Sequence, residues 1–536
     1  GATADKKITN NQFEFTQAMY TASGNSSWPY VSFTGDSTTV PWFVYPMTGA
    51  TITGNTFNNA APNGIHIRAR GIADDSTFDW ESYWNDNTFN KAVIAGPNLF
   101  SDVRAYSYVS GAYTLNDVRQ IGAVIQPEVD HAVNGDTVLV AAGTYPEAVT
   151  VNKSVTITGA GPTTTIIDPP AGNGLSIRAG DITVEDLQIT GAAHGANLGG
   201  TISNITFDNV HFLNNTSRGI EIQTAAADLI TNVQVLNSLF DTNNLGIRMA
   251  SNTRVDGITI DNTTFRNHVG SGFNQSNDGG VGWVKNLTVT NSTFTNNGTV
   301  SGYAGVYAEE FSNVLIEDST FTGNWFGINL WDGYNAAAST TTNVVIRNNT
   351  FTDHKMTTIT LQSTTGNSAV QLFLVENNTI NQNVGALVGA TAAHLAVTTS
   401  SANANGAVDV VDNEITFSGA FPTGITATYG VYLAGRAEDV RVEGNTIDGG
   451  GVGTNGATIP SSGIRLVTSI FQTNANINIT KNLINNFVNG VSIHNGSNVF
   501  GGVEAASVIK INRNDLSANS GYGIQSGPST ESNGTC

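Results

Sequence analysis

Charged, amide and aromatic side chains recur at equivalent positions of short, repeated apolar segments. When the segments that begin with Gly are aligned, one outward-facing column contains Glu221, Arg248, Asn274, Tyr307 and Asn329. A second column, two residues further on, contains Gln223, Glu309 and Trp331, flanked by Glu310 and Asp332. Carboxylates beside exposed aromatic rings can hold sugars, and two carboxylates at a suitable separation can hydrolyse a glycosidic bond. The alternative is a solvated sheet face of mixed polar residues.

A repeat along the chain must position these side chains. Segments such as Ile258–Phe265 and Leu287–Phe294 share one pattern, in which an alternating apolar stretch is followed by Asn, two small residues and an aromatic. The anchor residue of this pattern is found at Asn209, Asn237, Asn262, Asn291, Asp318, Asn348 and Asn377. A pattern that recurs at a nearly regular spacing along the chain is the signature of a repeat architecture. Alternating segments rich in Val, Ile, Thr and Phe indicate that the repeats are built of strands.

Each repeat unit is too short for a propeller blade and carries too little helical pattern for a helical solenoid. We therefore predict one coil of a β-solenoid per unit, with three short strands split by Gly and Asn turns. Parallel strands lie ~4.8 Å apart, so Glu309 and Trp331 should be close neighbours on successive coils. We also expect Asn262, Asn291, Asn348 and Asn377 to be buried, stacked from coil to coil as an asparagine ladder.

A more specific pattern precedes the repeats. The segments Val133–Glu147 and Val149–Gly161 follow a short amphipathic stretch, Ile125–Val133. On these residues the chain resembles the right-handed parallel β-helix superfamily typified by pectate lyases and polygalacturonases, over roughly residues 116–526. The resemblance implies an all-β fold, a right-handed parallel β-helix, with a capping helix near residues 123–133. Such a helix would cover the apolar interior and the unpaired strand edge of the first coil.

The catalytic motifs of that superfamily are not assembled in this sequence. The Arg-x-Pro-x-x-Arg pattern of pectate lyases is absent, and the sole Asp-Asp pair, Asp74–Asp75, lies outside the main repeats. His194–Gly195 lacks the leading Gly of the polygalacturonase motif, and no Gly-Gly-x-Gly-x-Asp calcium repeat is present. Eight His residues are scattered without metal-ligand spacing, so we expect no metal site. The family's sites therefore do not carry over.

Repeat-like segments also occur before the capping helix, at Lys7–Phe15, Ala50–Phe57 and Tyr83–Phe89. We divide the chain into a β-rich N-terminal segment (1–115), a main β-helix (116–526) and a polar tail (527–536). Two interpretations of the N-terminal coils remain open. They form a short domain packed beside the main solenoid, or they extend the last coil of another subunit in a head-to-tail filament.

Composition limits the function. Lys and Arg total 22 against 42 Asp and Glu, a formal charge of −20, which argues against nucleic-acid binding. No apolar run approaches the ~18 residues of a membrane span. Cys536 is the one cysteine, so an intrachain disulfide is excluded, whereas a pair between chains is not. No cofactor is expected; the acidity would suit structural calcium, but the sequence contains no motif for it.

We interpret the chain as a structural or adhesive β-solenoid that is secreted or displayed at the cell surface and self-associates. The alternative is a carbohydrate-active enzyme, a polysaccharide lyase or glycoside hydrolase. The candidate glycan-binding face contains Glu221, Arg248, Asn274, Tyr307, Glu309, Glu310, Asn329, Trp331 and Asp332. Long loops walling a groove over this face would favour the enzyme, and a flat face would favour the scaffold.

Overall fold

The computed structural model divides into two compact units. The N-terminal unit contains Gly1–Ala193 and Phe207–His211, and the C-terminal unit contains His194–Thr206 and Phe212–Cys536. The structure describes residues 6–15, 31–34, 50–59, 64–65, 67–70, 86, 88–91, 101–109, 112–120, 125–132, 134–140, 142–276, 282–332, 342–363, 370–388, 391–398, 405–420, 427–434, 437–450, 461–467, 476–495 and 508–528.

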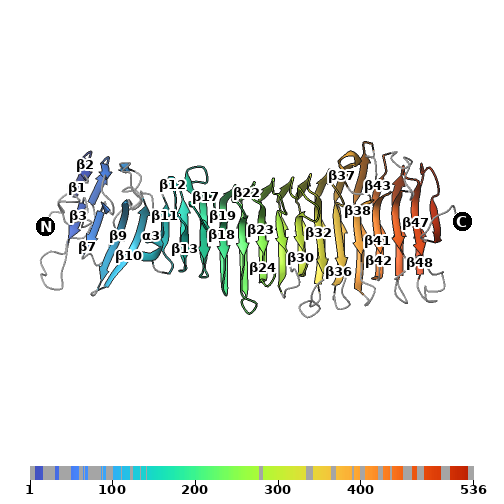
Figure 1. Cartoon of the computed structure of the whole chain (residues 1–536), viewed down its shortest axis with the longest axis horizontal. Helices are drawn as coiled ribbons and strands as arrows, with labels where there is room; N and C mark the ends of the chain where they lie inside the picture. Colours follow the sequence, from blue (N-terminus) through green and yellow to red (C-terminus); the bar gives the residue numbers. More distant parts are fainter. Residues whose placement is uncertain are drawn as a thin grey trace. The chain divides into compact units, whose positions relative to one another are not determined.

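In the C-terminal unit, the coils before the last contribute three kinds of strand, and each strand pairs in parallel with the equivalent strand of the next coil (Figure 1). The first strands are β21 (Ile230–Leu236), β24 (Arg254–Asp261), β27 (Trp283–Thr290), β30 (Phe311–Glu317), β33 (Thr342–Arg347), β36 (Val370–Glu376), β39 (Asn405–Val411), β42 (Ala437–Glu443), β45 (Asn476–Thr480) and β48 (Val508–Asn512). The second strands are β22 (Leu239–Asp241), β25 (Thr264–Arg266), β28 (Thr293–Thr295), β31 (Thr320–Thr322), β34 (Thr350–Thr352), β37 (Thr379–Asn383), β40 (Glu414–Ser418), β43 (Thr446–Asp448) and β46 (Leu483–Asn485).

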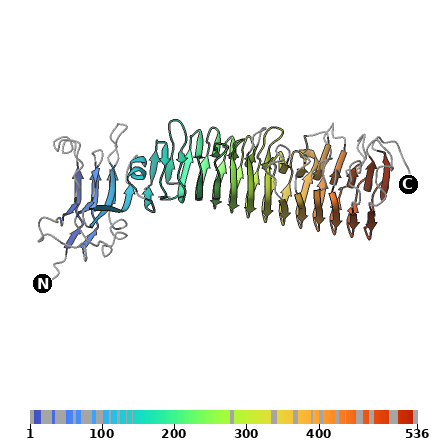
Figure 2. The ribbon, with the colours of Figure 1, turned by 90° about the horizontal axis from the view of Figure 1, so that it is seen from below.

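The third strands form one continuous sheet, called the third sheet below. It contains β18 (His194–Leu198), β20 (Arg218–Ile222), β23 (Leu245–Met249), β26 (Phe273–Gln275), β29 (Ala304–Ala308), β32 (Phe326–Asp332), β35 (Ile359–Ser363), β38 (Thr391–Thr398), β41 (Ala427–Ala434), β44 (Ser462–Val467), β47 (Asn489–Asn495) and β49 (Ile524–Pro528). Figure 2 shows the same green-to-orange coils stacked one on the next. A one-turn 3-10 helix, η1 (Val384–Ala386), interrupts one corner, and β19 (Ile202–Leu213) contains residues of both units.

Left-handed backbone at the corners turns the chain from strand to strand. In the coil that begins with β27, Asn286, Asn291 and Asn296 have φ values of 53°, 50° and 55°. Asn is the non-glycine residue that visits this region most readily, which explains why it recurs in the sequence. The anchor Asn of the repeat is thus the residue that makes the corner, and further left-handed residues lie five positions before and after it.

The predicted burial of the anchor asparagines is wrong. Asn262, Asn291, Asn348 and Asn377 are exposed, and the ladder is formed by the residue that follows each of them. Its rungs are Ser238, Thr263, Ser292, Ser319, Asn349, Asn378, Asn413, Asn445 and Asn482, all buried. The left-handed corner is the cause, because it breaks the alternation of the strand and turns the next side chain inward.

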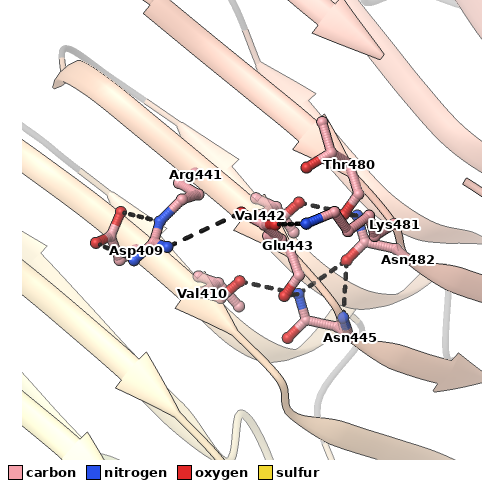
Figure 3. Close-up of polar contacts among 9 residues, drawn as sticks. All are labelled: Asp409, Val410, Arg441, Val442, Glu443, Asn445, Thr480, Lys481 and Asn482. Carbon is pink, nitrogen blue, oxygen red and sulfur yellow. Dashed lines mark hydrogen bonds and ion pairs between the residues drawn. The ribbon is translucent and has the colours of Figure 1, made fainter. Parts of the chain in front are cut away.

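Each rung accepts a hydrogen bond from the backbone of the preceding rung. The Asn349 and Asn445 N–H groups donate to Oδ1 of Asn378 and Asn482, both at 3.0 Å. Asn445 and Asn482 also donate through Nδ2 to the carbonyls of Val410 and Val442 (Figure 3). Outside the same corner, Asp409, Arg441, Glu443 and Lys481 form an exposed chain of ion pairs. The ladder therefore satisfies backbone groups that the corners would leave unpaired.

A second ladder lies at the corner between the second and third strands, next to an aromatic stack contributed largely by the second strands. The ladder contains Asn215, Asn243, His268, Asn297 and Asn324, and further along His354 and Gln382. The stack contains Phe212, Phe240, Phe265, Phe294, Phe321 and Phe351, with neighbouring ring centroids 4.5–4.9 Å apart. This separation matches the spacing of parallel strands, so in-register coils bring identical side chains into contact.

The predicted capping helix is confirmed in the N-terminal unit as α3 (Gln126–His131). Ile125 and Val129 are fully buried. The Glu147 carboxylate accepts hydrogen bonds from the N–H groups of Ile125 and Gln126, at the start of the helix. Lys153 donates to the carbonyls of Asp130 and Ala132, at its end. The helix therefore covers apolar interior while both of its ends are satisfied.

The coils that begin at the helix lie in the same unit. Parallel pairs join β11 (Thr137–Val140) to β14 (Thr156–Gly159) and β17 (Ile182–Thr190), and β12 (Gly143–Tyr145) to β15 (Thr165–Ile167). A third pair joins β13 (Val149–Val151) to β16 (Leu175–Ile177).

The repeat-like N-terminal segments also form parallel strands in this unit. β1 (Lys6–Thr9) pairs with β4 (Ala50–Thr53), and β2 (Gln12–Phe15) pairs with β5 (Thr56–Asn59) and then β8 (Thr88–Lys91). β3 (Val31–Thr34) pairs with β7 (Ile67–Arg70), and β6 (Gly64–Ile65) with β9 (Ser101–Val109). The antiparallel pair of β9 and β10 (Ala112–Gln120) then connects by hydrogen bonds to β11. The strands that precede the helix thus join the first coil within one unit.

Candidate functional site

The third sheet brings the predicted first column together. Glu221 on β20 lies beside Arg248 on β23, Arg248 beside Asn274 on β26, Asn274 beside Tyr307 on β29, and Tyr307 beside Asn329 on β32. The alignment of Gly-led segments therefore predicted the register of five successive coils. Asn197 on β18 precedes Glu221 in the same column.

A glycine lies near the start of each of these strands because a phenylalanine ring and a backbone carbonyl of the next coil occupy the space next to it. A Cβ on Gly219 would lie 2.4 Å from Cδ1 of Phe240, and one on Gly305 would lie 2.9 Å from Cδ1 of Phe321. Neither contact is sterically possible for a real Cβ. The phenylalanine stack thus requires the glycines, and the glycines set where each third strand starts and which residues enter the column.

The column is far less exposed than an outward-facing sheet surface would be. Glu221 is 3% exposed and Asn274 is 5% exposed, whereas Arg248, Tyr307 and Asn329 are half-buried. The prediction of a wet outer face is therefore wrong for this part of the third sheet. Buried polar groups of this kind are retained only where other polar groups satisfy them.

Two arginines satisfy Glu221. Arg248 Nη1 donates to Glu221 Oε1 at 3.1 Å, and Arg218 Nε lies 3.1 Å from Glu221 Oε2 without hydrogen-bond alignment. His194 pairs in register with Arg218 one coil away. We call His194, Arg218, Glu221 and Arg248 the arginine cluster.

Burial shapes the electrostatics of the arginine cluster. Burial raises the pKa of the Glu221 carboxyl, and the charges of Arg248 and Arg218 oppose that rise. Burial also lowers the pKa of the Arg218 guanidinium. The pKa of His194 is lowered by burial and then by the nearby charges of Arg218 and Arg248, so its imidazole is neutral at pH 7.

The second predicted group lies where the third strands end. Ala308 on β29 is paired in register with Leu330 on β32. Glu309 and Trp331 are the residues that directly follow these two, so they occupy neighbouring coils. Tyr307 donates its hydroxyl hydrogen to Glu309 Oε1 at 2.7 Å. Gln275 Oε1 accepts from the N–H groups of Glu309 and Glu310, both at 2.8 Å, which holds the two acidic residues in place.

The side chains of this group differ in exposure. Glu309 is 6% exposed, Glu310 is 1% exposed, and Trp331 is half-buried. Asp332 is the last residue of β32 and its side chain lies outside the described part of the chain. Gln223 is exposed and lies just after β20.

Sequence reasoning missed His194, Arg218 and Gln275. Strict alternation would place Arg218 and Glu221, three residues apart, on opposite faces of β20. Their ion pair shows that the tightly packed Gly219 shifts this alternation. For His194 and Arg218, the available signal was their position directly before Gly195 and Gly219.

No metal-binding group accompanies these residues. Within the described residues, no three His, Cys, Asp or Glu side chains come together in a way that could hold an ion. Among the same residues, no helix has the length and apolar character needed to cross a membrane. The arrangement can bind a polar ligand through charged hydrogen bonds, amide groups and aromatic rings.

The sequence matches a family model described as a right handed beta helix region over residues 148–301. No curated protein matches it. Similar solved structures include the A-module of mannuronan C-5 epimerase AlgE6 from Azotobacter vinelandii, which is 14% identical with a TM-score of 0.34, over 75% of this chain and 93% of that one. The catalytic domain of a GH87 alpha-1,3-glucanase is 13% identical with a TM-score of 0.37, over 70% of this chain and 64% of that one.

A third similar structure, the Dettilon tailspike protein, is 11% identical with a TM-score of 0.33, over 63% of this chain and 61% of that one. Identities and TM-scores this low carry no information about what this chain binds. The family match over residues 148–301 and the parallel coils described above show that the chain has a right-handed parallel β-helix fold.

Proposed function

We propose that the protein is an extracellular, adhesive β-solenoid that binds a glycan along the third sheet, between Glu221 and Trp331. The observation that supports this most directly is the register of the column. Five successive coils present an acid, a base, an amide, a phenol and an amide in one line. Adjacent strands lie ~4.8 Å apart, close to the length of one sugar unit in an extended polysaccharide.

The polar groups of this face are held in place before any ligand binds. Tyr307 is oriented by Glu309, and the backbone of Glu309 is fixed by Gln275. Gln275 Nε2 is a buried donor that has no hydrogen-bond partner within the described residues. Preorganised donors and acceptors reduce the entropy lost on binding, so modest contacts suffice for affinity.

The same geometry favours binding over hydrolysis at Glu221. Both of its oxygens face guanidinium groups, so neither is directed at a substrate. Head-to-tail self-association stays a prediction, which sedimentation of the full chain at high concentration tests.

A glycan array with matched variants tests the proposal. Trp331→Ala should abolish retention of the glycan, because an aromatic surface for a sugar ring is lost. Trp283, which stacks under Lys285 Nζ at 4.4 Å and belongs to β27 rather than to the third sheet, is the control. Trp283→Ala should leave retention unchanged.

Tyr307→Phe provides a milder second variant, since it removes a single hydroxyl. We expect it to weaken retention without a change in the circular dichroism spectrum. If the parent protein retained no glycan, or if the Trp283 and Trp331 variants behaved alike, the glycan-binding proposal would be wrong.

A further inference from the structure

The arginine cluster is a local excess of positive charge in a strongly acidic protein. The chain carries a formal charge of −20, whereas the two arginines of the cluster face one carboxylate, Glu221, and a neutral His194. Arg266 and Arg347, two more exposed arginines of the C-terminal unit, each face one carboxylate, Asp241 and Glu317. A second arginine on one buried acid therefore requires a separate explanation.

The two guanidinium groups keep donors that the protein does not use. Arg248 directs Nη1 to Glu221, and Arg218 directs Nη1 to the Ser217 hydroxyl. Within the described residues, Nη2 of each arginine has no hydrogen-bond acceptor. The arginine side chains are 21% and 23% exposed, while that of Glu221 is 4% exposed, so the positive groups reach solvent and the acid does not.

His194 adds an unpartnered polar atom to the same place. Its Nδ1 is buried and has no hydrogen-bond partner within the described residues. Its strand is next to that of Arg218, with the two residues in register. A buried ring nitrogen left without a partner is costly in a finished structure.

We propose that the arginine cluster binds an anionic substituent, a carboxylate or a sulfate ester, of the glycan on the third sheet. This inference rests on the proposed function and names the class of glycan. Glu221 acts as the spacer that fixes the two guanidinium groups on neighbouring coils. Planar guanidinium groups bind carboxylate and sulfate oxygens through paired, charge-assisted hydrogen bonds, which lysines cannot reproduce.

Two matched pairs of polysaccharides test the proposal with the full chain. Polygalacturonate is compared with its methyl ester, and dextran sulfate with dextran, by biolayer interferometry on immobilised protein. We expect the acidic member of at least one pair to bind tenfold or more tighter than its neutral partner, because hydrogen bonds to charged groups are the strong ones. The pair that discriminates identifies carboxylate or sulfate as the group recognised.

Arg248→Gln should remove that preference, and Arg248→Lys should restore only part of it. Arg347→Gln is the matched control, since it breaks an exposed Arg–Glu pair of the first strands with a 2.6 Å contact. Equal affinity for both members of both pairs, or equal behaviour of the Arg248→Gln and Arg347→Gln variants, would overturn the inference. Retention of neutral glycans with no acidic preference would leave the proposed function intact, whereas no retention of any glycan would overturn both.

Discussion

Replacement of His268 by Asn should make the solenoid less sensitive to acid. His268 is fully buried and is a rung of the second ladder, where its Nδ1 accepts the Asn243 N–H at 3.2 Å. That role requires an unprotonated Nδ1. Protonation places a charge in the apolar interior and removes the acceptor, although the Asn243 carbonyl at 3.1 Å offsets part of the cost. Asn297 shows that an amide serves as a rung at the next coil.

The sign and size of the change in stability with pH follow from the pKa of His268. Burial lowers the pKa of His268 from 6.5 to about 4. The unfolded chain therefore binds the proton first, so stability is complete above pH 6.5 and falls as the pH drops towards 4. Each unit of pKa shift corresponds to about 1.4 kcal/mol, so the loss of stability reaches about 3 kcal/mol, and most of it is present at pH 4.5. The pKa values of His354 and His394 are lowered by burial in the same direction, to about 4 and about 3.

Hydrogen exchange of individual amides measures this change, because solenoids open locally rather than all at once. Between pH 7 and pH 4.5, the opening free energy at the Asn243 amide should fall by about 2–3 kcal/mol more in the parent protein than in the Asn variant. Amides of the Asn413 and Asn445 rungs, which lie beside no histidine of this ladder, are the internal control. An identical pH dependence in both proteins at Asn243 would refute the argument.

Three further predictions concern the coil itself, and for all of them hydrogen exchange of amides in the affected coils measures the change in opening free energy. Asn378→Leu removes a rung that makes hydrogen bonds to Asn413 and to two backbone carbonyls, and should cost about 1–3 kcal/mol, whereas the exposed Asn381→Leu should change stability by less than about 0.5 kcal/mol. Asn291→Val places a β-branched residue at a φ of 50° and should cost about 1–2 kcal/mol of stability. Asn291→Gly should be nearly neutral, and equal effects of the two variants would contradict the assignment of Asn291 to a left-handed corner. Phe321→Ala should cost about 3–5 kcal/mol, because its ring packs at 4.9 Å between two others; a loss below about 1 kcal/mol would show that the stack contributes little.

The register of the candidate site could be predicted from the sequence because the fold is periodic. In a parallel stack with one repeat per coil, aligning the repeats also aligns the strands. The order from Glu221 through Asn274 to Asn329 followed from that alignment. The capping helix was expected near residues 123–133 from the family resemblance, and it is found at Gln126–His131.

The tertiary structure decided which side chains of the repeat are buried. Asn291 and Ser292 are neighbours in the sequence, and both are plausible rungs, yet Asn291 is exposed while Ser292 is buried. A shift of one residue reverses the face of every side chain in a strand, and the left-handed φ of Asn291 sets that shift. Composition alone cannot choose between them, because both residues form hydrogen bonds at turns.

The arginine cluster depended on tertiary structure in the same way. Arg218 and Glu221 face each other because Gly219 packs against Phe240, a residue from the following coil. The sequence repeats determined a β-solenoid and an ordered polar column, and the family resemblance added its right hand and its capping helix. Contacts between coils determined which of those polar groups are buried and which meet, because burial at each position is set by side chains a full coil away.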